Sequence, residues 1–175
     1  MTYDFQFGSN YFGSALYWPE DWPPRDEIEG YWVSKAVENY LSHGCPADKI
    51  NLGFAFAAPI PQVVRESPHW GKIEQKLKAA GWYDSQEPPL KKVQDLLEDK
   101  NGFTKEWDRG ARMAYIATEI EGQKQLVLSY IEPRGIREKL NYVKERGLGG
   151  AMFWELGADY DNSLVAQIAE ELFIV

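Results

Sequence analysis

The sequence predicts an α/β fold built around a parallel sheet. Three candidate strands indicate it: MTYDF at residues 1–5, NLGFAF at 51–56 and GAMFW at 150–154, each followed by loop residues and then a segment of helical periodicity. The second and third runs are almost continuously apolar, which is typical of strands buried on both faces of a parallel sheet. Strand, helix and strand in this order form the βαβ unit of such sheets.

Apolar side chains recur at helical spacing after each run. They do so over residues 26–43, where Gly44 followed by Pro46 marks the end of the helix, and again over 136–147. A last amphipathic helix is predicted over residues 161–173. Its candidate N-caps are Asp161, Asn162 and Ser163.

Residues 59–131 are predicted to form a separate α+β subdomain, because ordinary connections between a strand and a helix have about 2–6 residues. Its first half is predicted to contain two helices. The first begins after Ser67 and Pro68 and ends at Gly81, and its apolar residues at helical spacing are Trp70, Ile73, Leu77 and Ala80. The second has Leu90, Val93 and Leu97 at the same spacing. The second half, residues 112–131, alternates like an antiparallel hairpin that turns at Glu121 and Gly122.

Composition excludes several classes of function. The 27 acidic and 19 basic residues give a net charge of -8 without a long run of one sign, which disfavours nucleic acid and anionic membranes as partners. The single cysteine, Cys45, excludes an intramolecular disulfide, and His43 and His69 lack the spacing of metal ligands, so neither a metal nor another cofactor is predicted. The first ten residues lack the features of a signal peptide, and no apolar run reaches the roughly 20 residues of a membrane span.

Polar and aromatic side chains stand at two predicted strand ends: Tyr3 and Asp4 at the first, Trp154 and Glu155 at the last. In a parallel α/β barrel, the C-terminal ends of the strands open on one face, where functional groups gather. Two interpretations remain open from the pattern alone. The side chains converge on the mouth of a cleft, or Tyr3 and Trp154 are core aromatics and Asp4 caps a loop.

Four strings, in order along the chain, resemble the C-terminal part of glycoside hydrolase family 18, the chitinases. They are MTYDF, WVSKAVENYLSHGCPADKINLGFAF, GFTKEWDRGARMAY and LSYIEPRGIREKLNYVKERGLGGAMFWELGAD. The last string is the most specific, with Tyr130, Ile136, Lys139, Tyr142 and the run 148–152 leading to Trp154 at the family's spacing. The resemblance implies a partial (β/α)8 TIM barrel that carries strands six to eight, formed by residues 1–58 and 132–175, with 59–131 as the family's α+β insertion subdomain.

The resemblance also implies a substrate and roles for single residues. Family members hydrolyse β-1,4-linked N-acetylglucosamine polymers by substrate-assisted catalysis, so the implied partner is chitin or an N-acetylglucosamine oligosaccharide. Tyr3 matches the tyrosine that holds the acetamido group, and Asp4 matches its neighbour that hydrogen-bonds the sugar. Met1 matches a methionine lining the same pocket, and Trp154 matches the tryptophan that forms its floor. The family is often secreted, while the compartment of this chain stays open.

Three departures from the family pattern bear on activity. The motif Asp-x-x-Asp-x-Asp-x-Glu, which supplies the general acid, does not occur in this chain, so hydrolysis by the chain alone is expected to be slow or undetectable. Ala57-Ala58-Pro59 stands in place of the usual Tyr-Gly-Arg, and Tyr130-Ile131-Glu132 in place of Tyr-Asp-Asp. Because Met1 matches a methionine that is internal in the family, the chain is expected to be a late segment of a longer hydrolase.

Two alternatives to a hydrolase segment stay open. One is a non-catalytic, chitin-binding or carbohydrate-binding protein that retains Tyr3, Asp4 and Trp154. The other is a scaffold for a protein partner, because three parallel strands cut from a barrel expose sheet edges that soluble proteins cover. The N-terminal barrel portion, a second copy of the chain or an inward collapse of the helices could cover them.

The remaining aromatic and histidine residues have structural interpretations. Trp107, Asp108 and Ala111 match a WD..A element of the family's insertion and are expected to hold its core. Packing is favoured over sugar contact for Trp18 and Trp22 in their proline-rich loop, and Trp32 falls on the core face of its helix. His43 and His69 are expected to be solvated or capping groups.

Overall fold

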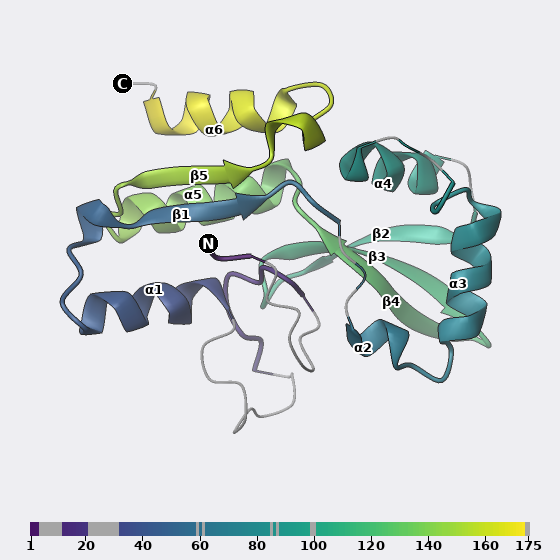
Figure 1. The fold of residues 1–175 in the computed structure, drawn as a ribbon. Coiled ribbons are helices and arrows are strands. Elements are labelled where there is room, and N and C mark those ends of the chain that lie inside the picture. Colours follow the sequence, from purple (N-terminus) through teal and green to yellow (C-terminus); the bar gives the residue numbers. More distant parts are fainter. Residues whose placement is uncertain are drawn as a thin grey trace.

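The fold is taken from a computed structural model. It describes residues 1–3, 12–20, 32–58, 60, 62–84, 86, 88–98 and 101–173. Figure 1 shows a parallel strand pair surrounded by α1, α5 and α6 at one end of the molecule, and an antiparallel sheet with α2, α3 and α4 at the other. The predicted α/β class is confirmed.

The parallel pair joins β1, Asn51–Ala55, to β5, Gly150–Trp154, in a register that runs from Asn51 opposite Gly150 to Ala55 opposite Trp154. Three helices cover it: α1 at Val33–Ser42, α5 at Pro133–Glu145 and α6 at Ser163–Phe173. Their apolar faces and the strands share one core, which is the arrangement predicted from helical spacing. Short 3-10 turns precede β1 at Ala47–Lys49 and follow β5 at Leu156–Ala158.

The two predicted buried strands differ in their burial. In β1, Leu52 and Phe54 are fully buried, whereas β5 is half-buried along its length and ends in Trp154, which is 63% exposed. The prediction of a strand buried on both faces was therefore wrong for β5. Within the described part of the chain, β5 has β1 on one edge and no strand on its other edge, so its cover is incomplete.

The first predicted strand, residues 1–5, is not a strand over residues 1–3, and residues 4 and 5 lie outside the described residues. Residues 1–3 run beside β1, but Thr2 makes the contact through its side chain. Its Oγ1 donates to the carbonyl of Gly53 at 2.9 Å and accepts the N–H of Gly53 at 3.1 Å. A side chain that occupies both main-chain groups of Gly53 replaces the ladder that a strand would form at this position.

The second sheet is antiparallel, in the order β2, Phe103–Asp108; β3, Met113–Ile120; β4, Gln123–Tyr130. The predicted turn at Glu121 and Gly122 is confirmed, with φ angles of 55° and 77° that are typical of a two-residue hairpin turn. Helices α2, Gln62–Arg65; α3, Trp70–Ala79; and α4, Pro89–Glu98, accompany the sheet. This part of the chain has its own core, with Ile73, Leu77, Val93 and Ile116 in its interior.

Candidate functional site

The C-terminal ends of β1 and β5 border an open hollow of about 660 Å³. Trp154 ends β5, and the N–H of Phe56 donates to its carbonyl at 2.8 Å, so that the main chain beyond β1 stays fixed against β5. The remaining wall of the hollow is the segment that leads into α4, with Gln86, Pro88 and Pro89. An exposed indole beside a polar amide is a surface on which the C–H face of a sugar packs.

Tyr3 lies on the same face of the sheet as Trp154. Its hydroxyl is 3.9 Å from the sulfur of Met152, which precedes Trp154 by two residues on β5 and therefore points to the same side. The Tyr3 ring lies directly over Gly53, the register partner of Met152; a Cβ on Gly53 would come within 2.9 Å of the ring. The structure thus brings Tyr3 and the end of β5 together, with Tyr3 only 9% exposed.

A narrow cavity adjoins Tyr3 and contains a buried amine. It is lined by Tyr3, Ser14, Ser129, Lys139 and apolar side chains, among them Met113. Lys139 lies on α5 and is 0% exposed, and its Nζ donates to Ser14 Oγ at 2.6 Å. Burial lowers the pKa of Lys139 to about 7, because a charged ammonium is poorly solvated inside the protein.

Met1 and Asp4 do not join this arrangement in the described structure. Met1 is 86% exposed and lines another hollow beside Ile50 and Asn51, at the opposite end of β1 from the Trp154 hollow. Asp4 lies outside the described residues, as does Trp22. Glu155 borders the Trp154 hollow and is exposed, although the family resemblance assigns no role to it.

The side chains interpreted as structural pack within the protein. The rings of Trp18 and Trp32 lie 5.8 Å apart, and Asp108 accepts the N–H of the fully buried Ala111 at 2.8 Å. The guanidinium of Arg134 lies 4.1 Å from the centre of the Trp107 ring. These contacts tie the loop at residues 12–20 and the β2–β3 connection to their surroundings.

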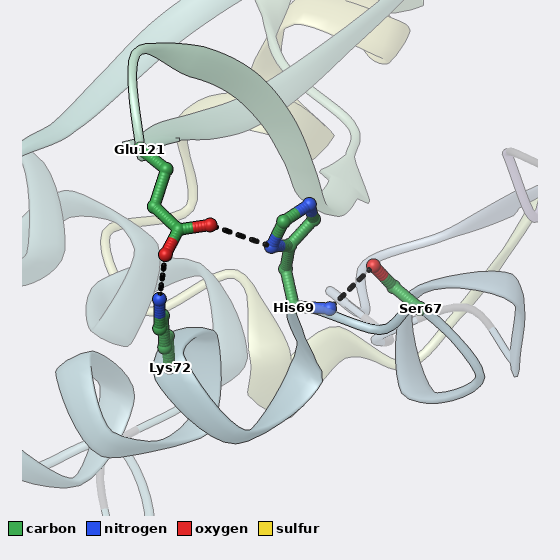
Figure 2. Close-up of polar contacts among 4 residues, drawn as sticks. All are labelled: Ser67, His69, Lys72 and Glu121. Carbon is green, nitrogen blue, oxygen red and sulfur yellow. Dashed lines mark hydrogen bonds and ion pairs between the residues drawn. The ribbon is translucent and has the colours of Figure 1, made fainter.

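Both histidines interact with neighbouring groups far from the Trp154 hollow. His43 Nδ1 lies 2.7 Å from the carbonyl of Asn39 at the end of α1, as expected for a capping group. Figure 2 shows Glu121 between two side chains of the α3 region, where its carboxylate pairs with Lys72 and lies 4.0 Å from His69 Nδ1. The main-chain N–H of His69 donates to Ser67 Oγ at 3.2 Å. This cluster joins the β3–β4 turn to α3 and has a structural role.

Among the described residues, no group of three or more histidine, cysteine, aspartate or glutamate side chains is placed to hold a metal ion. None of the helices in the described ranges is long and apolar enough to cross a membrane. The arrangement at the strand ends consists of an aromatic platform, a tyrosine hydroxyl, the Gln86 amide and the exposed Glu155 carboxylate. Such a surface is suited to a hydroxyl-rich ligand.

Sequence reasoning did not single out Lys139 as a functional group, although a signal for it exists. Lys139 stands between Ile136, Leu140 and Val143 on the buried face of α5, where a helix of this kind carries apolar residues. A lysine on the apolar stripe of a helix predicts a buried amine. Its partner Ser14 could not be identified because it lies 125 residues away in the chain.

Comparison with known proteins identifies the group to which this arrangement is similar. The sequence pattern of Glycosyl hydrolases family 18 matches residues 1–159. Chitinase A1 of Niallia circulans is 26% identical over 180 residues, covering 98% of this chain and 25% of the relative. Endochitinase 1 of Metarhizium robertsii is 32% identical over 149 residues, covering 78% of this chain and 30% of the relative. The chain therefore spans about a quarter to a third of the length of these two relatives.

Comparison with solved structures points to the same family. A family 18 N-acetylglucosaminidase from Paenibacillus barengoltzii superposes with a TM-score of 0.62 at 27% identity, covering 98% of this chain and 47% of that structure. A family 18 chitinase from Cycas revoluta, solved in complex with (GlcNAc)4, gives a TM-score of 0.63 at 20% identity, covering 98% of this chain and 45% of the other. The described fold is thus similar to that of the barrel chitinases.

Proposed function

Because the chain belongs to Glycosyl hydrolases family 18, we propose that it forms one side of the substrate cleft of a chitinase-type glycoside hydrolase that acts on β-1,4-linked N-acetylglucosamine polymers. One observation carries the proposal: Tyr3 and Trp154 lie on the same face of β5, and Trp154 borders an open hollow. The (GlcNAc)4 bound by the Cycas revoluta chitinase is the kind of ligand that we assign to this hollow.

In this proposal, β1 and β5 are the seventh and eighth strands of a (β/α)8 barrel, and residues 1–5 belong to the position of the sixth. Residues 59–131 are then the family's insertion subdomain, and 1–58 with 132–175 the barrel portion. The parallel register of β1 and β5 and the separate core of the antiparallel sheet support this division.

Within the cleft, the Trp154 indole provides the floor on which a sugar ring packs, since 63% of its surface is accessible. Tyr3 supplies a hydroxyl to the acetamido group. A donor held at a fixed position serves better than one on a mobile loop, because its ordering costs no further entropy when the substrate binds. Asp4 retains its proposed role beside Tyr3, whereas the position of Met1 beside Ile50 and Asn51 does not support the role that the resemblance implies for it.

Hydrolysis needs a general acid, which contributes about 10²–10⁴-fold to such a reaction. The printed sequence does not contain the acidic motif of the family. We therefore assign that group to a further portion of the barrel, whose strands would also pair with the free edge of β5.

Titration with (GlcNAc)4, followed by isothermal calorimetry, tests the cleft. Substituting Trp154→Ala is expected to weaken binding by roughly five- to ten-fold, because an aromatic contact contributes on the order of 1 kcal/mol. Tyr40→Ala is the matched control, since Tyr40 is 64% exposed on α1, outside the hollow. Equal effects of the two substitutions would contradict the assignment of Trp154.

Mixing the chain with a separately produced N-terminal barrel portion that carries the acidic motif tests the enzymatic part. Cleavage of a chitooligosaccharide by the mixture, and not by either part, is the expected result. A well-folded complex that neither binds nor cleaves the oligosaccharide would overturn the proposal.

The exposed indole also favours a second candidate, a carbohydrate-binding protein without catalysis. The two candidates differ in the mixture with the added portion. Affinity of the chain for (GlcNAc)4, together with no gain of cleavage in the mixture, identifies the binding protein. Cleavage by the mixture identifies the hydrolase segment.

A further inference from the structure

The main chain at Tyr3 is held in place by hydrogen bonds from side chains. Residues 1–3 form no strand, and the Thr2 hydroxyl holds them against β1 by hydrogen bonds with both main-chain groups of Gly53. The carbonyl of Thr2 accepts a second bond, from Ser14 Oγ at 2.8 Å. The main chain beside Tyr3 is thus fixed from two directions by side chains.

The segment that contains Ser14 is held in place by main-chain hydrogen bonds. The neighbouring Ala15 accepts the N–H of Val33 at 2.9 Å, and Leu16 donates its N–H to the carbonyl of Ala111 at 2.9 Å. The segment that carries Ser14 is therefore anchored both to the start of α1 and to the β2–β3 connection. Movement of Ser14 would have to break these main-chain bonds.

Lys139 completes the chain of hydrogen bonds. Its Nζ donates to Ser14 Oγ at 2.6 Å, and Ser14 in turn donates to the carbonyl of Thr2 at 2.8 Å. An ammonium that donates to a hydroxyl polarises it and strengthens the bond that the hydroxyl donates onward. Because Lys139 is fully buried, water does not compete for this interaction.

We infer that Lys139 is a positioning residue for Tyr3, which it holds in place through Ser14 and the main chain of Thr2. The consequence for sugar binding rests on the function proposed above, whereas the positioning itself does not. Lys139 and Tyr3 also line the same cavity, so the amine acts on the support of Tyr3 at short range.

The surroundings make the strength of this support dependent on pH. The pKa of Lys139 is lowered to about 7, so the amine changes charge near neutrality. Among the described residues, the groups that face it are Tyr3, the hydroxyls of Ser14 and Ser129, and the Phe54 ring on β1, 5.9 Å away; none is a carboxylate. Above about pH 7 the donor becomes a neutral amine, and the support is expected to weaken.

Two of the three methionines provide a direct test by NMR of protein labelled with ¹³C at the methionine methyl groups. Met113 lines the cavity of Lys139, and Met152 contacts the Tyr3 hydroxyl. In the unaltered chain, the Met113 and Met152 signals are expected to shift together with a midpoint near pH 7.

Two variants separate positioning from a general structural role. In Lys139→Leu, the step near pH 7 should vanish from both Met113 and Met152. In Ser14→Ala, the step should persist at Met113, because the amine still titrates, and vanish at Met152, because the link to Thr2 is cut. If Lys139→Leu does not fold, the titrations of the unaltered chain and of Ser14→Ala still test whether Lys139 positions Tyr3 through Ser14.

A Met152 signal without a step near pH 7 in the unaltered chain, or with an unchanged step in Ser14→Ala, would overturn the inference. Affinity for (GlcNAc)4 gives the functional readout. It is expected to fall on the order of five-fold between pH 6 and 8, with no such fall in Ser14→Ala. If no sugar binds at any pH while the NMR steps occur as expected, the proposed function fails and the positioning role stands.

Discussion

The Tyr3 hydroxyl lies 3.9 Å from the sulfur of Met152, although the two residues are 149 positions apart in the chain. The contact places the start of the described chain on the face of β5 that ends in Trp154. It depends on Gly53, because a residue with a side chain at this position of β1 would occupy the space of the Tyr3 ring. The packing around Gly53 therefore links the fold to the candidate site.

The first prediction concerns Gly53→Ala. The added Cβ would lie 2.9 Å from Tyr3 Cε1 and 3.1 Å from the main-chain nitrogen of Thr2, so residues 1–3 must shift. We expect a loss of about 1–3 kcal/mol in the free energy of unfolding, measured by urea denaturation. Gly71→Ala on α3 is the control, because its Cβ meets nothing within 4 Å and should stabilise the helix slightly. A Gly53→Ala chain as stable as the control would show that the ring does not pack against β1.

The second prediction concerns the pH dependence of stability. A folded-state pKa of about 7 for Lys139, below the usual 10.5, means that the unfolded chain binds one more proton between these values. The contribution of this group to the free energy of unfolding should therefore rise with pH, by about 1.4 kcal/mol per pH unit from roughly pH 7 to 10. Urea denaturation across this range should show the rise, and subtraction of the Lys139→Leu profile should isolate it. Parallel profiles for the two chains would contradict a buried amine that titrates near neutrality.

Part of this architecture was predictable from the sequence. β1, β5, α3, α5, α6 and the turn at Glu121 and Gly122 follow from periodicity and turn chemistry, both of which are local. β2 was not predicted, because FTKEWD exposes charged side chains and buries only Phe103 fully. The absence of a strand at residues 1–3 was not predictable either, since the pairing depends on Gly53 and the Thr2 hydroxyl.

The candidate site was predictable to a similar extent. The pattern left open whether Tyr3 and Trp154 converge at strand ends or are core aromatics; the structure brings them to one face of the sheet, with Tyr3 buried and Trp154 exposed. The support beneath Tyr3 was not expected. Hydrogen bonds from Lys139 to Ser14 and from Ser14 to Thr2 join three distant segments, and no local pattern specifies such a network.

The third prediction concerns the Glu121 cluster shown in Figure 2. The hydrogen bond and charge of Lys72 lower the pKa of Glu121 from its ordinary 4.5, with a smaller effect of His69. Because a carboxylate with a lowered pKa stabilises the fold above its unfolded pKa, this contribution should be lost as the pH falls through the folded value. Lys72→Met should raise the pKa of Glu121 in a ¹³C NMR titration. Lys78→Met, which removes the partner of Glu74 on the same helix, should leave it unchanged.

The last prediction concerns the start of α6, where the sequence offered Asp161, Asn162 or Ser163 as the N-cap. In the structure, Asp159 accepts two main-chain N–H groups of the helix, from Leu164 at 3.3 Å and from Val165 at 2.9 Å. Asp161 accepts the N–H of Ser163 at 3.0 Å. Asp159 is the stronger cap, because it is 4% exposed and each of its oxygens satisfies a separate helix donor.

Asp159→Ala should therefore lower the free energy of unfolding by about 1–2 kcal/mol, measured by urea denaturation. Asp161→Ala is the matched control and should cost less than half as much, because the Asp161 hydrogen bond is exposed to water. Asp159→Asn keeps one acceptor, so its loss in the free energy of unfolding should lie between those of Asp159→Ala and Asp161→Ala. A larger loss for Asp161→Ala would mean that the cap lies where the sequence pattern placed it, and that the Asp159 carboxylate contributes little to the orientation of α6 behind Trp154.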